Sequence, residues 1–111
     1  RSFLPIMIKG TFMNKNSLHL SIKAKTSLNE IINYTRKQWG KKEFQHLKRR
    51  LNDLIEIIQS NPYAFKTYDG NEQVRQALLL TNISVFYMVN DSSIHILLFW
   101  DNRRDPDTLN L

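Results

Sequence analysis

Two stretches of apolar residues at helical spacing, separated by Gly40, constrain the fold of this 111-residue chain more than any other feature. Apolar side chains recur every three or four positions over residues 28–39, and over residues 44–58 they form one continuous stripe. Glycine is common just past a helix end, and Asn61-Pro62 ends the second stretch because proline cannot continue a helix. Two amphipathic helices joined by so short a connection are predicted to form an antiparallel helical hairpin.

The segment before the hairpin alternates polar and apolar residues. Residues 17–22 read Ser-Leu-His-Leu-Ser-Ile, the period-two pattern of a strand with one buried face, and His19 is expected to point away from the core. Thr26 or Ser27 is expected to begin the first helix, because Glu30 stands three residues beyond Ser27 as in a capping box.

Strand signals also follow the hairpin. Residues 74–80, 83–89 and 94–100 are rich in strand-forming residues and are separated by turn residues. The last two runs are apolar on both faces, which predicts interior strands with the hairpin on one face and partial cover on the other. The sequence therefore predicts an α+β fold in the order β-α-α-β-β-β, with the hairpin packed on a curled, mainly antiparallel sheet.

Composition narrows the classes of function. Without cysteine, the chain has no disulfide, thiolate zinc site or cysteine nucleophile. Sixteen Lys and Arg against ten Asp and Glu give a net charge of +6, which favours an anionic partner. No apolar run could span a membrane, so we expect a cytoplasmic protein with no membrane partner. We expect residues 17–111 to form a single domain and residues 1–16 to be an N-terminal arm, either a native extension or a cloning remnant.

Patterns for metal or acid-base chemistry are weak. His19, His46 and His95 have no ligand spacing, so we expect neither a metal site nor a cofactor. Asp53 and Glu56 are an i, i+3 pair on a polar helix face, where such pairs are most often solvated. The three glycines stand apart, so no glycine-rich phosphate loop is present.

Basic residues carry more information. One set crowds the end of the first helix and the outer face of the second: Arg36, Lys37, Lys41, Lys42, Lys48, Arg49 and Arg50. This set is either an ordinary solvated face or a docking surface for an acidic partner or a phosphate backbone. A second set lies near strand starts or on the C-terminal tail: Lys66, Arg75, Arg103 and Arg104. The two tail arginines either pair with Asp101 and Asp105 or, as we favour, form part of a partner site, because arginine held near a rigid strand end suits bidentate contacts.

Taken together, the order and spacing of these segments resemble the RelE/ParE toxin superfamily of bacterial type II toxin-antitoxin systems. The resemblance covers about residues 17–109. It rests on the helix end Tyr-Thr-Arg-Lys-Gln-Trp-Gly at 34–40, Asn-Pro at 61–62, Val-Phe-Tyr-Met-Val at 85–89 and the segment Phe-Trp-Asp-Asn-Arg-Arg-Asp-Pro at 99–106. A toxin of this superfamily would have the fold that the pattern predicts.

The resemblance implies one of two activities. RelE-like members cleave mRNA in the ribosome without metal, and Lys66, Arg75 and Arg103 would be the catalytic candidates here. However, Ser84 and Leu109 stand where the RNA-cleaving pattern has Arg and Tyr. ParE-like members instead poison DNA gyrase and are not known to be catalysts.

The helix end at 34–40 is typical of the ParE branch, although Asp101 stands where many of its members have His. We therefore favour gyrase, with Arg75, Arg103 and Arg104 as target-binding residues, over the ribonuclease.

The resemblance also implies a cognate antitoxin, whose disordered segment folds over the toxin in a hetero-oligomer. The residues expected to contact it are Arg36, Lys37, Lys48, Arg49, Phe99 and Trp100. Tyr87 fits the superfamily pattern, and we interpret it as a core tyrosine with a satisfied hydroxyl.

A further alternative is a small basic nucleic-acid-binding module. Such a module needs exposed aromatic side chains between basic ones, whereas Phe86, Phe99 and Trp100 lie in continuous apolar runs that are typical of a core. A toxin relic that keeps only the antitoxin-binding fold is also compatible with the sequence.

Overall fold

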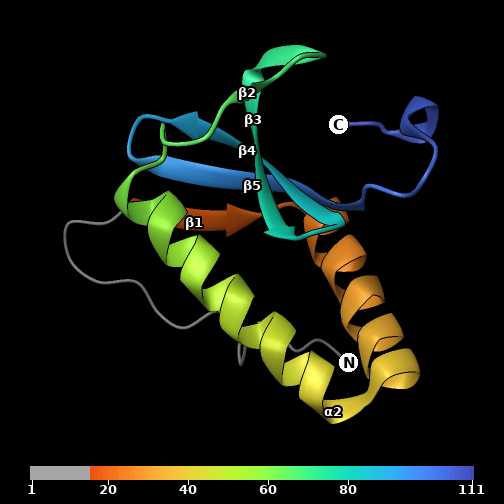
Figure 1. The fold of residues 1–111 in the computed structure, drawn as a ribbon. Helices are drawn as coiled ribbons and strands as arrows, with labels where there is room; N and C mark the ends of the chain where they lie inside the picture. Colours follow the sequence, from red (N-terminus) through yellow and green to blue (C-terminus); the bar gives the residue numbers. More distant parts are fainter. Residues whose placement is uncertain (1–15) are drawn as a thin grey trace.

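The computed structural model of the chain describes residues 16–111, so the predicted N-terminal arm lies, apart from Asn16, outside the described residues. The elements follow in the order β1 (Ser17–Leu20), α2 (Ile22–Ser60), β2 (Thr67–Tyr68), β3 (Asn71–Leu80), β4 (Ile83–Asn90), β5 (Ser93–Asp101) and the short 3₁₀-helix η1 (Pro106–Thr108). Figure 1 shows a sheet with α2 on one side and the C-terminal tail near its other side.

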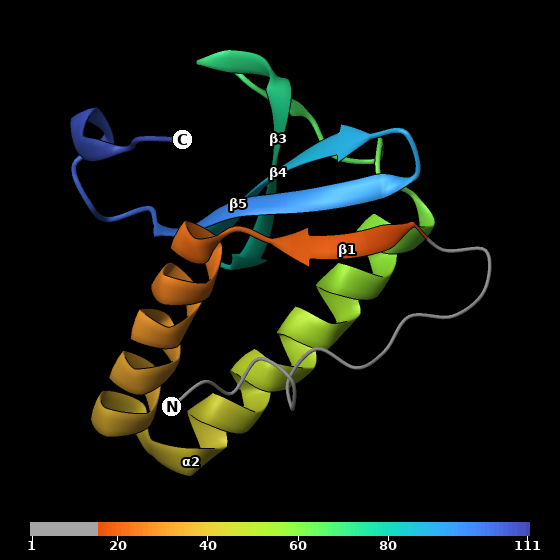
Figure 2. The ribbon, with the colours of Figure 1, turned by 180° about the vertical axis from the view of Figure 1, so that it is seen from behind.

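Helix α2 is the predicted hairpin. It turns back at Gly40, whose φ of 86° and ψ of −168° lie in a region that essentially only glycine adopts. Both halves of α2 lie on the same side of the sheet and diverge from the turn in a V (Figures 1 and 2). No helix within residues 16–111 is long and apolar enough to cross a membrane.

The start of the first helix differs from the prediction. The helix begins at Ile22, and Ser21 is its N-cap, because the Ser21 side chain accepts a hydrogen bond from the backbone N–H of Ala24. Ser27 lies inside the helix, where its hydroxyl oxygen accepts a 3.0 Å hydrogen bond from the backbone N–H of Phe99 on β5. The predicted capping box is therefore wrong: Ser27 connects the helix to the sheet instead of capping the helix.

The sheet has the strand order β1-β5-β4-β3-β2. Strand β1 pairs with β5 in parallel, and the other neighbours are antiparallel, so the predicted mainly antiparallel sheet is confirmed. The sequence pattern missed β2 and placed the start of β3 at Val74 instead of Asn71. Strand β2 has only two residues, too few for a period-two pattern to be visible.

Apolar side chains cover both faces of the central strands, as predicted. The core between the hairpin and the sheet includes Leu28, Leu51 and Tyr87. A second apolar cluster lies on the opposite face of the sheet and consists of Val74, Phe86, Leu98 and Trp100, with Tyr68, Met88, Leu97 and Leu109 packed against them. Leu109 comes from the tail after η1, so the tail folds back over this face.

Candidate functional site

A hollow, called here the hairpin groove, lies between α2 and the ends of the central strands. Its volume is about 710 Å³. The groove is lined by Ser27, Glu30, Ile31, Tyr34, Thr35, Trp39, Glu43, His46, Leu80, Asn82, Ile83, Phe99, Asp101, Arg103 and Arg104. Apolar side chains from both α2 and the sheet therefore meet here with two arginines of the tail.

Two aromatic side chains of the groove are largely exposed. Tyr34 is 51% exposed and Trp39 is 65% exposed, although the helical spacing placed Trp39 on the buried stripe. Both belong to the half of α2 that ends at Gly40, and the turn at Gly40 is the part of α2 farthest from the sheet (Figure 1). Exposed aromatic groups beside an apolar hollow are a frequent feature of protein interfaces.

Arg103 is held in place by Asp101. Its Nε and one terminal nitrogen donate to the two carboxylate oxygens of Asp101 at 3.0 and 2.6 Å, and its backbone N–H donates to the same group at 2.9 Å. The hydrogen bonds from Arg103 lower the pKa of Asp101, and the same pairing raises the pKa of Arg103. The pairing with Asp101 is thus present, yet the Arg103 side chain is still 62% exposed.

Arg104 is fixed in another way. Its guanidinium carbon lies 4.5 Å from the centre of the Trp100 ring, a cation–π arrangement on the second apolar cluster. Asp105, the other predicted partner, instead accepts a hydrogen bond from the backbone N–H of Asp107 at the start of η1.

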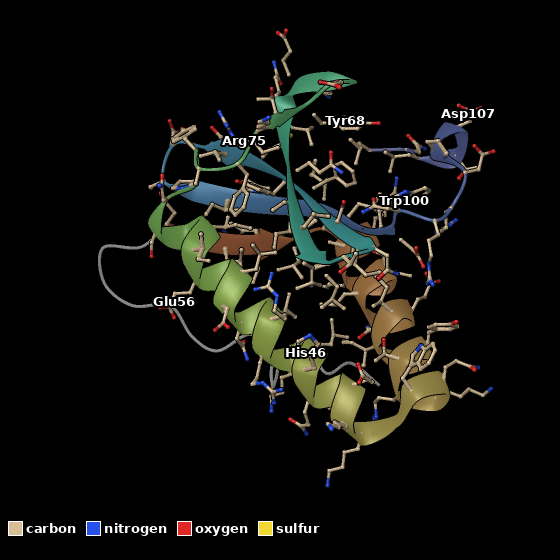
Figure 3. The ribbon with its side chains drawn as sticks, in the orientation of Figure 1. His46, Glu56, Tyr68, Arg75, Trp100 and Asp107 are labelled. Atoms are coloured by element: carbon tan, nitrogen blue, oxygen red, sulfur yellow. The ribbon has the colours of Figure 1, made fainter. Side chains whose placement is uncertain are left out.

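Arg75 and Lys66 lie at the other end of the sheet. The Arg75 guanidinium donates a 2.7 Å hydrogen bond to the carbonyl oxygen of Phe65 and lies 4.9 Å from the centre of the Tyr63 ring. Lys66 is exposed in the same segment. Figure 3 shows Arg75 and Trp100 at opposite ends of the sheet.

The strand register gives the separation of the two ends. Arg75 pairs with Tyr87 and Asp101 pairs with Ile83, four positions apart on β4. At about 3.3 Å per residue, the two positions are roughly 13 Å apart along the strand. The structure therefore does not bring Lys66 and Arg75 together with Arg103.

Ser84 connects β3 to the tail. It is fully buried, and its hydroxyl accepts a 2.9 Å hydrogen bond from the side-chain amide of Gln76 and donates a 3.0 Å hydrogen bond to the side-chain oxygen of Asn102. Asn102 directly precedes the two arginines, so this chain of hydrogen bonds orients the start of the tail. A serine inside an otherwise apolar strand is the one sequence signal of this role, because a buried hydroxyl group needs hydrogen-bond partners.

The residues expected to contact an antitoxin fall into two groups. Lys37 and Arg49 are exposed on α2, Lys48 is half-buried there, and the Arg36 guanidinium carbon lies 5.2 Å from the centre of the Phe44 ring. Phe99 and Trp100 are only 2% and 6% exposed, so they line hollows in the surface and offer a partner little area for direct contact.

Arg50 departs from the expected outer face of the hairpin. Its Nε donates a 3.1 Å hydrogen bond to the carbonyl oxygen of Leu79, at the outer edge of β3.

Comparisons with known proteins give a likeness of fold. No protein-family model matches the sequence, and no curated protein matches it. Among solved structures, a chain of the chromosomal ParDE toxin-antitoxin system from P. aeruginosa is 19% identical, with a TM-score of 0.64 over 78% of this chain and 95% of that one. The YoeB dimer from Staphylococcus aureus is 16% identical, with a TM-score of 0.53 over 75% and 92% of the two chains.

A chain of the E. coli DinJ-YafQ toxin-antitoxin complex is 9% identical, with a TM-score of 0.55 over 79% of this chain and 93% of that one. These likenesses define the class of structure: the chain shares its fold with these chains of toxin-antitoxin systems. The resemblance to the RelE/ParE superfamily that the sequence indicates is thus confirmed at the level of the fold.

Proposed function

We propose that this protein is the toxin of a type II toxin-antitoxin pair, that it stops growth by binding DNA gyrase, and that a cognate antitoxin neutralises it. The fold supports the toxin role, because structures with this fold include the ParDE and DinJ-YafQ toxin-antitoxin systems. The gyrase target rests on the residues that occupy the sheet face opposite the hairpin.

The observation that carries the choice of gyrase is the apolar character of that sheet face. Ser84 and Leu109 occupy positions where the RNA-cleaving pattern has Arg and Tyr. Ser84 is fully buried, and its hydroxyl group is hydrogen-bonded to Gln76 and Asn102 within the protein. Leu109 packs on the second apolar cluster. Cleavage of RNA needs a base for the 2′-hydroxyl and an acid for the leaving oxygen. Neither side chain can supply these groups, which supports an inhibitor that acts by binding.

Arg103 and Arg104 are the residues that we propose contact gyrase. Both lie on the tail beside the hairpin groove, and each is held by a neighbour on β5, Asp101 or Trp100. Side chains that are already ordered lose less conformational entropy on binding. Arg75 is engaged with Tyr63 and Phe65 far from this pair, so we assign it to holding the segment after α2 in place.

The antitoxin is proposed to occupy the hairpin groove. Its apolar floor and the exposed rings of Tyr34 and Trp39 suit the apolar face of an amphipathic helix. Basic residues on α2, among them Lys37 and Arg49, would attract the acidic face of such a helix. The net charge of +6 favours the same partner.

The proposal is tested by gyrase supercoiling assays with purified protein. We expect the wild type to inhibit supercoiling, Arg103→Ala to lose at least about tenfold in potency, and Lys42→Ala, an exposed change near the turn of α2, to keep it. Circular dichroism establishes that both variants are folded. Full potency of Arg103→Ala would contradict the assignment of Arg103, and no inhibition by the wild type would contradict gyrase as the target.

The ribosome-dependent ribonuclease is the second candidate. One observation favours it: Arg103 matches the tail arginine of the RNA-cleaving pattern and its side chain is largely exposed. A simple nucleic-acid-binding module is less well supported, because Phe86 and Phe99 are buried and cannot serve as platforms for stacking bases.

A further inference from the structure

His19 and His95 lie side by side although 76 residues separate them in the chain. Strand β1 runs parallel to β5 with His19 directly opposite His95, and their ring centres are 5.0 Å apart with planes inclined by 17°. Leu18 and Leu20 pack into the core beneath the hairpin. Because side chains alternate along a strand, the imidazoles lie on the opposite face of the sheet.

Met88 extends this pair into a row. It stands directly opposite His95 on β4, and it packs against the second apolar cluster, on the same face as the two imidazoles. The side chains of His19, His95 and Met88 therefore occupy one line across three adjacent strands. Among residues 16–111, no group of three His, Cys, Asp or Glu side chains could hold a metal ion. The row has three possible metal ligands only because it includes the Met88 thioether.

The donor types in this row, two imidazoles and one thioether, favour copper. We propose that His19 and His95 bind one copper ion through their imidazoles and that the Met88 thioether is the third ligand. Imidazole suits several transition metals, whereas a thioether is a soft ligand that favours Cu(I). Methionine has three rotatable bonds, so its sulfur can reach an ion held above the neighbouring strand. The stacked rings have to tilt toward each other to direct one nitrogen each at the same ion.

The surroundings of the pair support such a movement. His19 is exposed on the edge strand, and its Nε2 lies 3.4 Å from the Ser17 hydroxyl, which also lies 3.0 Å from the Ser93 hydroxyl. These weak contacts hold the ring near His95 without burying it. The site lies outside the hairpin groove and shares no residue with it, so it stands independently of the proposed toxin activity.

The test is a Cu(I) titration of the full chain under anaerobic conditions, in competition with a chromogenic Cu(I) chelator. We expect one ion per chain. Because loss of a residue that merely orients a metal ligand lowers affinity about 10- to 100-fold, His19→Ala and His95→Ala should each weaken binding at least about tenfold. The matched control is His46→Ala, an exposed histidine on α2, which should leave binding unchanged.

The variant Met88→Leu tests the contribution of the thioether to copper binding apart from that of the two imidazoles. This change keeps the volume and apolar character of the side chain, so we expect weaker Cu(I) binding but unchanged Ni(II) binding, because nickel gains little from a thioether. Nuclear magnetic resonance of the wild type gives a readout that needs no variant: copper should perturb the ring signals of His19 and His95 and leave those of His46 unchanged. Binding that persists in His19→Ala and His95→Ala, or Cu(I) binding that Met88→Leu does not alter, would overturn the proposal.

Discussion

The hydroxyl group of Tyr87 donates a 2.8 Å hydrogen bond to the carbonyl oxygen of Pro62. Tyr87 is fully buried on β4, and Pro62 lies two residues past the end of α2, so this bond ties the end of the helical hairpin to the centre of the sheet. The interpretation of Tyr87 as a core tyrosine with a satisfied hydroxyl is thereby confirmed.

Replacement of this tyrosine should change how stability depends on pH. Burial raises the pKa of Tyr87 to about 12 from the ordinary value of 10.0. A raised pKa means that the folded protein favours the protonated phenol, so this stabilisation is complete below pH 10 and is lost as the pH rises toward 12. A shift of about two units corresponds to roughly 2 to 3 kcal/mol.

In Tyr87→Phe, we therefore expect the free energy of unfolding to fall less between pH 10 and 12 than in the wild type. At pH 7 the variant should be less stable by about 1 to 3 kcal/mol, because the Pro62 carbonyl loses its buried donor. Urea denaturation at several pH values measures both effects. Tyr63→Phe, at an exposed tyrosine, serves as control. If the free energy of unfolding of Tyr87→Phe fell between pH 10 and 12 as much as that of the wild type, the raised pKa of Tyr87 would not be the cause of that fall.

Gly40 is predicted to be required for its backbone conformation alone. A Cβ atom at this position would meet nothing within 4 Å, but the φ of 86° lies where side chains are strained. Gly40→Ala should therefore lower the free energy of unfolding by about 1 to 3 kcal/mol. Urea denaturation beside Lys41→Ala, an exposed change at the next residue, isolates the glycine effect. Equal stability of the two variants would show that the turn does not need glycine.

Asp101 should contribute to stability against acid. The hydrogen bonds from Arg103 lower its pKa, so its contribution is present above the ordinary pKa of an aspartate and is lost as the pH falls through the lower folded value. Asp101→Asn should flatten the decline in melting temperature between about pH 5 and pH 2. Asp53→Asn, at an exposed site on α2, provides the comparison. If the melting temperature of Asp101→Asn fell as steeply with decreasing pH as that of the wild type, the pairing of Asp101 with Arg103 would not contribute to stability against acid.

Much of the fold could be predicted because it follows from local periodicity. The hairpin is visible as two helical stripes around Gly40, and β4 and β5 as continuous apolar runs. Other features depend on positions far apart in the chain and leave no local pattern. The parallel contact of β1 with β5 and the hydrogen bond from the Phe99 N–H to the Ser27 hydroxyl are of this kind.

The candidate site was predictable only in part. The tail arginines could be recognised because they follow a buried strand end, and the structure shows how Asp101 and Trp100 hold them. The groove itself could not be predicted, because helical spacing places Trp39 on the apolar stripe, whereas its position beside the Gly40 turn leaves it 65% exposed.

The exposed ring of Trp39 should matter for binding but not for folding. Because its side chain is largely solvated, Trp39→Ala should change the free energy of unfolding by less than about 0.5 kcal/mol. The same change should weaken the affinity for the cognate antitoxin at least about tenfold, as expected for an aromatic residue at the centre of an interface. Isothermal titration calorimetry measures the affinity. The control is Leu78→Ala, at a residue that is 54% exposed on β3 and does not line the groove. Equal affinity of both variants would place the antitoxin elsewhere.

The most direct test of the central proposal, that this protein acts on gyrase by binding, compares two assays on one preparation of the wild-type protein. One assay follows supercoiling by purified gyrase, and the other follows cleavage of mRNA on programmed ribosomes. We expect the protein to inhibit supercoiling and to leave the mRNA intact. Cleavage of mRNA that requires the ribosome, with supercoiling unaffected, would contradict this proposal and would show that catalysis proceeds despite Ser84 and Leu109.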